Sequence, residues 1–235
     1  MTKNGIDVSR FQGVIDWAAV KAAGVDFAII KAGGSDAGLY TDSAYERNYE
    51  GAKAAGVPVG AYYYVGRLCI SRADGIADAE RFIEMLKGKE FEYPVFIDLE
   101  ETAPKDKAGA TEAVIAFCET MESAGYYCGI YASDISGFKD RLDISRLTAF
   151  DKWVANYSTQ PKYVASYGMW QKSSKGRIAG IFGDVDIDEA YQDYPTIIKA
   201  NGLNGFKKPE PPKKQMKVTI EYDEHIYSGL LDEQL

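Results

Sequence analysis

Short apolar runs alternate with segments of helical spacing through the first half of the chain. The runs are rich in β-branched and aromatic residues, as buried strands are, and lie near 4–8, 26–32, 58–65, 93–99 and 126–132. Between them, apolar residues recur at helical spacing, as at Tyr45, Tyr49 and Ala52. Strands that alternate with helices predict a parallel sheet covered by helices, and a closed barrel is one way to complete it.

Glycines mark the ends of three predicted helices. The sequence KAAGV occurs twice and ESAGY is a looser copy, which places Gly24, Gly56 and Gly125 where a helix commonly ends in a left-handed residue. Ser71 and Thr111 come before apolar stripes and are predicted helix starts.

The rhythm changes in the second half. Three further strand-like segments, KWVANY, YGMWQK and GDVDID, lie at 152–157, 167–172 and 183–188. They begin only about 15 residues apart, which leaves no room for full helices between parallel strands. The sequence therefore predicts an α/β fold, an eight-stranded TIM-like barrel with an incomplete helix ring, (β/α)5(β)3.

A lysine- and proline-rich segment follows the predicted barrel. KKPEPPKK reads as an extended linker, which divides the chain into a barrel over 1–206, a linker over 207–217 and a short acidic tail over 218–235. The tail alternates like a strand at KVTIEY and again at HIYSGLL, which suggests a β-hairpin. So few residues cannot bury a core alone, so the tail either docks on a partner surface, such as another copy of the chain, or stays mobile.

Composition and charge exclude several classes of function. The 235 residues are 46% hydrophobic and carry a net charge of -8, which gives nucleic-acid binding little electrostatic support. No apolar run has the roughly 20 residues that a membrane span needs, and the start MTKNGIDVSRF lacks a signal-peptide core, so we expect synthesis in the cytoplasm and no membrane insertion. The three cysteines have no metal-type spacing and are expected to be buried thiols.

The single histidine, His225, lies in the predicted tail. The barrel therefore cannot hold a Ser-His-Asp or Cys-His centre, nor a zinc site built on imidazoles, and we expect no cofactor or metal. Any proton chemistry must come from carboxylates, with Tyr or Lys as the remaining options.

Two acids follow a strongly apolar strand in VFIDLEE. Asp98 and Glu100 are two residues apart, so both face the same way, and at the carboxyl end of a barrel strand that direction is the mouth where active sites lie. Like charges in a partly buried site raise each other's pKa, so one of the two tends to keep its proton near neutral pH. A protonated acid beside a charged partner is what glycoside hydrolysis needs. The alternative is a pair of solvated loop acids, or Asp98 as a helix cap.

Further acids and aromatic residues surround these strand ends. Asp7 follows the first strand, and Asp186 and Asp188 lie in the last, so closing the barrel brings Asp7 and Asp186 near Glu100. Aromatic rings cover the apolar faces of sugars, and the candidate substrate contacts are Tyr62, Tyr64, Tyr131, Trp153, Tyr157 and Trp170, with Gln171 as a hydrogen-bond partner. Trp17, inside VIDWAAV, is assigned to the core.

Seven motifs occur in an order and spacing that resemble the glycoside hydrolase family 25 lysozymes, the N-acetylmuramidases common among phage endolysins. They are GIDVSRFQGVIDW, VGAYYYV, PVFIDLE, GIYAS, KWVANY, MWQKSS and GDVDID, and together they cover about 1 to 206. The resemblance implies a barrel with helices on part of its circumference. It also implies hydrolysis, with net retention, of the β-1,4 bond between N-acetylmuramic acid and N-acetylglucosamine in the glycan strands of peptidoglycan.

The resemblance also implies residue roles. Glu100 matches the general acid, and Asp98 matches its partner, either a nucleophile or the group that orients the substrate's own N-acetyl oxygen. Asp7 and Asp186 match two outer acids that hold substrate and tune Glu100, and Tyr62 would lie beside the sugar. Two departures stand out: Tyr63 replaces a frequent His, and Asp188, a further candidate substrate contact, replaces a frequent Asn.

Three other functions compete with this one. A chitinase-like barrel also ends a strand in D-x-E, but FEYPVFIDLE lacks the spaced aspartates that usually come before it. A catalytically silent glycan-binding barrel is disfavoured by the complete acidic set, and a wall amidase or peptidase by the absence of histidine from the barrel. The resemblance to endolysins implies action on the cell wall after release by a separate membrane-permeabilising protein.

Overall fold

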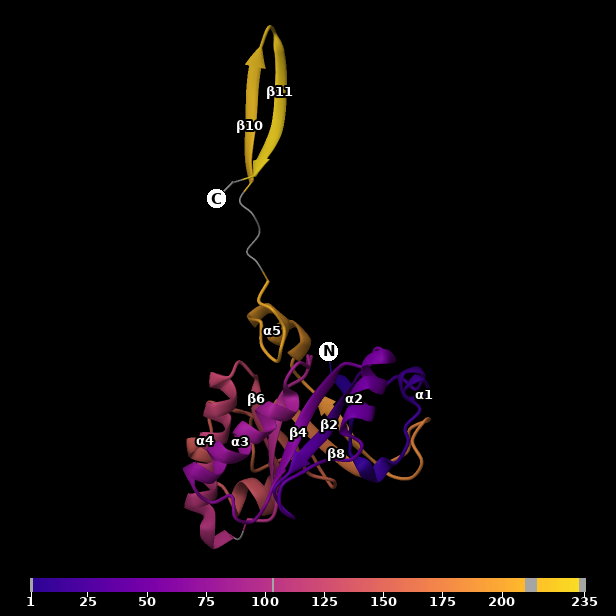
Figure 1. Cartoon of the computed structure of the whole chain (residues 1–235), viewed down its shortest axis with the longest axis vertical. Helices are drawn as coiled ribbons and strands as arrows, with labels where there is room; N and C mark the ends of the chain where they lie inside the picture. The colour runs from indigo at the N-terminus through magenta and orange to yellow at the C-terminus, as the bar shows by residue number, and fades with distance from the viewer. Residues whose placement is uncertain (1, 103, 210–214, 233–235) are drawn as a thin grey trace.

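A computed structural model describes residues 2–102, 104–209 and 215–232. Eight strands close into a barrel, β1 (Lys3–Val8), β2 (Phe27–Gly34), β4 (Val59–Val65), β5 (Val95–Leu99), β6 (Cys128–Ser133), β7 (Asp151–Ala155), β8 (Met169–Gly176) and β9 (Val185–Ala190). The order around the barrel is β1-β9-β8-β7-β6-β5-β4-β2, and β1 pairs with β2 to close the ring. The predicted α/β barrel is thus confirmed (Figure 1).

Helices cover only part of the barrel. α1 (Trp17–Ala22), α2 (Tyr45–Ala54), α3 (Arg72–Leu86) and α4 (Lys107–Ser123) connect the strands from β1 to β6. Later connections contain only short turns, η3 (Asp134–Lys139) and η4 (Ile144–Arg146), and the smaller elements elsewhere are η1 (Arg10–Gln12), η2 (Pro104–Asp106), β3 (Tyr40–Thr41) and α5 (Tyr194–Asn201). The change of rhythm in the sequence therefore marks the end of the helix ring.

The last barrel strand runs against the others. β9 pairs antiparallel with both β1 and β8, whereas the remaining barrel pairs are parallel. The sequence predicted a parallel sheet from the alternating strands and helices of the first half, and it gave no direction for β9; a short return from β8 suits an antiparallel neighbour. The reversal places the first residues of β9, not its last, at the carboxyl end of the parallel strands.

Two apolar layers follow from the alternation of side chains along each strand. One set faces the helices and packs against α2, α3 and α4, with Trp17 among its buried members. The other set fills the barrel and includes Phe27, Ile29, Tyr62, Phe96, Tyr131, Trp153 and Met169. Inward positions nearer the mouth carry polar groups instead, and these make the site.

Helix ends agree with the sequence in most places. Gly24, Gly56 and Gly125 have φ of +85°, +69° and +86°, as predicted for residues that end helices. Ser71 caps α3, where its side chain accepts a hydrogen bond from the Asp74 amide. Thr111 is not a helix start: α4 already begins at Lys107, and the Thr111 hydroxyl donates to the Lys107 carbonyl inside the helix.

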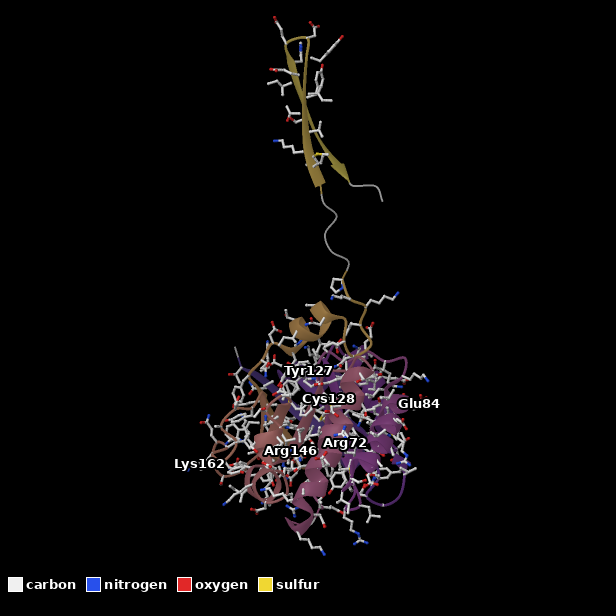
Figure 2. The ribbon with its side chains drawn as sticks, turned by 90° about the vertical axis from the view of Figure 1, so that its left-hand side faces the viewer. Arg72, Glu84, Tyr127, Cys128, Arg146 and Lys162 are labelled. Atoms are coloured by element: carbon white, nitrogen blue, oxygen red, sulfur yellow. The ribbon has the colours of Figure 1, made fainter. Side chains whose placement is uncertain are left out.

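Ion pairs join the outer faces of α3 and α4. Arg72 of α3 contacts Glu119 at 2.6 Å and Glu112 at 3.4 Å, and Arg146 of η4 contacts Glu112 at 2.7 Å. Figure 2 shows Arg72 and Arg146 on this side of the barrel, and all the groups are partly exposed. The three cysteines are buried free thiols, as expected.

The tail forms the predicted hairpin. β10 (Gln215–Tyr222) and β11 (His225–Asp232) pair antiparallel in a sheet of their own. Asp223 and Glu224 both have positive φ, +49° and +58°, which is the two-residue turn that matches strand twist. β10 starts inside the segment predicted as linker.

Candidate active site

Strand pairing gathers the predicted acids at the carboxyl end of the parallel strands. Asp98 of β5 lies between Tyr64 of β4 and Tyr131 of β6 in register. Asp7 of β1 is directly opposite Asp186 of β9, because the reversed strand brings its first residues to this end. We call the acids Asp7, Asp98, Glu100, Asp186 and Asp188, together with the side chains around them, the acidic mouth.

Asp98 and Glu100 form one electrostatic unit in the acidic mouth. Asp98 is 4% exposed, and burial, reinforced by the charge of Glu100, raises the pKa of its carboxyl well above the ordinary value. Glu100 is more exposed, yet loss of water around it also raises the pKa of its carboxyl. Both shifts favour a proton held by the pair, which meets the requirement for a general acid beside a carboxylate.

A second cluster of acids lies across the mouth. Burial and the charges of Asp188 and Asp186 raise the pKa of Asp7 well above its usual range. Burial, with the charge of Glu100, raises the pKa of Asp186 to about 6. Burial raises the pKa of Asp188 to about 8, although the Trp153 indole donates a 2.8 Å hydrogen bond to it.

Gln171 connects this cluster to two tyrosines. Its Nε2 donates to Asp7 Oδ2 at 2.7 Å, and its Oε1 accepts from the hydroxyls of Tyr131 and Tyr157, both at 2.8 Å. An ionised carboxylate can only accept, so Asp7 faces the amide nitrogen, and the two hydroxyls then donate to the amide oxygen. The hydrogen bonds of Gln171 are therefore made to other protein side chains, and the residue is only 3% exposed.

The structure places the predicted aromatic contacts at different depths. Tyr62 lies at the floor, with its ring 6.1 Å from that of Trp153, and Tyr64 and Tyr157 are more open to solvent. Trp153 is 1% exposed and Asp188 0%, so the structure places both below the surface of the mouth. Trp170 lies on the opposite side of β8 from the inward-facing Met169 and Gln171, and its indole donates to the Asn156 carbonyl, so the structure does not bring it together with the other predicted contacts.

Tyr63 also faces away from the mouth. It packs with Phe82 and Phe117 under the helices, and its hydroxyl donates to Asp78 at 3.3 Å. The departure from the frequent His at this position therefore changes the helix layer and leaves the acidic mouth intact.

Sequence reasoning missed Lys31, which lies in the all-buried strand β2. Its Nζ is 4.3 Å from the centre of the Tyr64 ring and 5.7 Å from that of Tyr62, and the residue is 8% exposed. The positive charge of Lys31 lowers the pKa of both Asp98 and Glu100, opposing the effect of burial. A lone lysine in the apolar run VDFAIIKAG was the signal that could have found it.

Arg141 adds a second positive charge near Glu100. Its charge also lowers the pKa of the Glu100 carboxyl, and its guanidinium donates to the carbonyls of Thr102 and Ser136. Among the described residues, no three His, Cys, Asp or Glu side chains are arranged to hold a metal ion. The arrangement is thus one of paired acids balanced by nearby cations.

Comparison with known proteins places this geometry in a family. The family model described as Glycosyl hydrolases family 25 matches residues 6–181, three quarters of the chain. The chain belongs to glycosyl hydrolases family 25. The matched residues begin in β1 and end in the loop before β9.

Three similar proteins illustrate the relationship. The autolytic lysozyme of Clostridium acetobutylicum is 33% identical over 79% of this chain and 55% of its own length. A protein of Streptococcus phage B30 named D-alanyl-L-alanine endopeptidase is 29% identical over 95% of this chain and 52% of its own. The CTP1L endolysin structure is 27% identical, covers 84% of this chain and 70% of its own, and superposes with a TM-score of 0.72.

This family 25 chain spans only about half the length of those two curated relatives. In the part of the chain that the structure describes, no helix combines the length and apolar character needed to cross a membrane.

Proposed function

We propose that this family 25 protein is a lysozyme that hydrolyses the β-1,4 bond between N-acetylmuramic acid and N-acetylglucosamine in bacterial peptidoglycan. The observation that carries the proposal is the Asp98–Glu100 pair, in which both pKa values are raised by burial beside the positive charge of Lys31. The names autolytic lysozyme and endolysin, borne by relatives, support the same substrate class.

Glu100 is the general acid in this proposal. Its raised pKa keeps a proton available, and its position at the open end of the pair lets it reach the departing sugar oxygen. Asp98, in the more buried position, acts either as nucleophile or as the group that orients the substrate's N-acetyl oxygen, and both routes retain the anomeric configuration.

Asp7 and Asp186 hold the substrate and tune Glu100 from across the mouth. The charge of Glu100 contributes to the raised pKa of Asp186, so proton uptake by one of these carboxyls favours ionisation of the other. Tyr62, Tyr64, Tyr131 and Tyr157 form the aromatic wall beside the sugar, while Trp153 and Asp188 support the wall from below.

Product analysis on purified peptidoglycan tests the proposal. We expect new reducing ends on muramic acid, identified by borohydride reduction and mass spectrometry. Reducing ends on glucosamine would indicate a different glycosidase, such as a chitinase-like enzyme. New amino groups without reducing sugar would indicate a peptidase or amidase, as the name of the phage B30 relative suggests for that protein. Binding without cleavage would indicate a silent glycan-binding barrel.

The same proposal places the enzyme at the bacterial cell wall. The endolysin relative favours access to the wall from inside the cell after a separate protein permeabilises the membrane. Expression in bacteria with a susceptible wall should then cause little lysis until the membrane is permeabilised, for instance with chloroform. Rapid lysis without permeabilisation would contradict this route.

We also propose that the hairpin joins two copies of the chain. Its residues Met216, Ile220, Tyr222 and Tyr227 share one face and are each 57–73% exposed, and a lone two-stranded hairpin is marginally stable in water. Packing this face against its equivalent in a second copy would bury it symmetrically. An antiparallel arrangement separates the two acidic turns, which the sequence places at 221–224.

Light scattering on the full chain tests the self-association. We expect twice the 25.9 kDa of one chain. Ile220→Asp should give monomers, whereas Thr219→Asp, on the other face of the same strand, should leave the dimer intact. A monomer at all concentrations would rule the proposal out.

A further inference from the structure

A groove runs alongside the acidic mouth between the 35–44 loop and α3. It consists of three adjoining cavities of about 380, 380 and 650 Å³. Asp36 lines the first and the second, Arg81 the second and the third, and Tyr40 the first and the third. These shared lining residues show that the three cavities adjoin one another, and we refer to them together as the groove.

The groove shares its inner wall with the acidic mouth. Lys31 Nζ lies 5.7 Å from the centre of the Tyr40 ring and 4.3 Å from that of Tyr64, so a residue that lines the groove and a residue of the mouth flank the same lysine. Tyr40 donates a 2.7 Å hydrogen bond to Asp36, and the charge of Asp36 contributes to the raised pKa of Asp98. Asp36 and Tyr40 thus form the end of the groove that lies beside the mouth.

Most charged groups of the groove are already engaged by the protein. Asp78 is 4% exposed and accepts hydrogen bonds from Ser35, Tyr63 and Arg81. Asp74 accepts a hydrogen bond from Ser71 at the start of α3. Arg67 is exposed and makes no ion pair with any acid in the part of the chain that the structure describes. Its guanidinium is the free cation of the groove.

The rest of the lining suits a short peptide with small side chains. Leu39 and Leu68 are 59% and 76% exposed at opposite parts of the groove, and Ala77 lies between the second and third cavities. Apolar patches beside one uncommitted guanidinium match a ligand that carries methyl groups and a carboxylate.

Such a ligand is attached to the proposed substrate. Each muramic acid of peptidoglycan carries a short stem peptide, which contains alanine residues and free carboxylates. We propose that the groove between the 35–44 loop and α3 binds the stem peptide of a muramic acid next to the cleaved bond, and that Arg67 contacts a stem carboxylate. This inference rests on the proposed lysozyme activity and adds a specificity determinant to it.

Two soluble substrates test the inference. One is a glycan oligomer that carries stem peptides, and the other is the same oligomer after an amidase has removed them. We expect the wild-type enzyme to have a higher kcat/KM for the peptide-bearing oligomer. Arg67→Ala should lower that value about tenfold, mainly through KM, and leave the value for the bare glycan unchanged.

Two further variants sharpen the comparison. Arg67→Lys keeps the charge but loses the forked geometry, and should fall between wild type and Arg67→Ala. Arg146→Ala removes a surface arginine that pairs with Glu112 outside the groove, and should leave kcat/KM unchanged for both substrates. Equal losses on both substrates, or no loss on either, would overturn the inference.

A binding measurement keeps the inference separate from the proposed activity. In a Glu100→Gln background, calorimetry with muramyl tetrapeptide should detect binding that Arg67→Ala weakens. If the wild-type enzyme cleaves neither oligomer, the lysozyme proposal fails, while this measurement still decides whether the groove binds the peptide. Affinity that is independent of Arg67 would refute the groove assignment.

Discussion

The side-chain amide of Gln171 donates a 2.7 Å hydrogen bond to Asp7, joining two strands that are 164 residues apart in the sequence. The bond lowers the pKa of Asp7 against the larger effects of burial and neighbouring acids, which raise it. The hydroxyls of Tyr131 and Tyr157 can donate or accept, so the orientation of the Gln171 amide follows Asp7, which accepts from its nitrogen. Gln171 therefore positions Asp7 and offsets part of the rise in its pKa that burial causes.

Replacing Gln171 should shift the acid limb of activity. In Gln171→Leu, Asp7 loses a donor and its pKa rises further, so a larger share of Asp7 is protonated at any given pH. If ionised Asp7 holds substrate, the acid limb of the plot of kcat/KM against pH moves to higher pH. Tyr157→Phe is the matched control, because it removes one donor to Gln171 but leaves the amide bonded to Asp7. An unchanged acid limb in Gln171→Leu would remove Asp7 from the mechanism.

Glu100→Gln should abolish most of the activity while the fold persists. Loss of a general acid costs about 10²–10⁴-fold in rate. The raised pKa of Glu100 means that the folded protein disfavours its charge, so the neutral amide should not lower the melting temperature. Glu101→Gln is the control, since Glu101 is an exposed neighbour with only a 3.5 Å contact to Tyr64. Wild-type rates in Glu100→Gln would show that another group protonates the leaving oxygen.

Asp188 should make the protein less stable as the pH rises. Its pKa is about 8 in the folded state, above the ordinary value near 3.8, so the protonated form is the one that folding favours. Its favourable contribution is complete below the unfolded pKa and is lost as the pH climbs to about 8, at a rate of at most about 1.4 kcal/mol per pH unit. Asp188→Asn should therefore melt above wild type at pH 8. The difference in melting temperature between the variant and wild type should be smaller at pH 4. A difference that grows toward acid pH would contradict the raised pKa of Asp188.

Lys31 should set the pH range of the enzyme. Its charge lowers the pKa of both Asp98 and Glu100. In the proposed mechanism Asp98 must ionise and Glu100 must stay protonated. Lys31→Met removes that charge, so both limbs of the pH–rate profile should move to higher pH together. Lys31→Arg keeps the charge and should keep the limbs in place. A fall in rate with no displacement of the profile would indicate that Lys31 acts only through packing.

Side-chain alternation and strand order were enough to predict the barrel and the meeting of its acids. An i, i+2 pair after a buried strand must face one way, and ring closure brings Asp7 and Asp186 within the same mouth. Strand direction is not written in such a pattern, so the reversal of β9 was missed. Depth was missed for the same reason: Trp153 has the residue type of a sugar contact, but its neighbours Tyr131 and Phe96 cover it.

Partnerships across the barrel were also hidden from the sequence. Lys31 looks like an interruption of an apolar strand until Tyr64 and the Asp98–Glu100 pair are seen around it. The groove depends on a loop at 35–44 whose sequence has neither helical nor strand periodicity, and on Arg67, which has no acidic partner among the described residues.

Truncation should separate the tail from the barrel at a defined residue. Asn204 is fully buried beneath the barrel, where its side chain donates to the Tyr93 carbonyl and accepts from the Tyr127 amide. A chain that ends at residue 206 keeps these bonds and should fold and cleave soluble glycan fragments at the full-length rate. A chain that ends at residue 203 loses these two bonds and also those of the Asn204 backbone with Phe91 and Gly125, so it should melt at a markedly lower temperature. On insoluble walls, the chain that ends at residue 206 should bind more weakly than the full chain, because it loses the second barrel that self-association would supply. Unfolding of the chain that ends at residue 206 would instead make the hairpin part of the folded core.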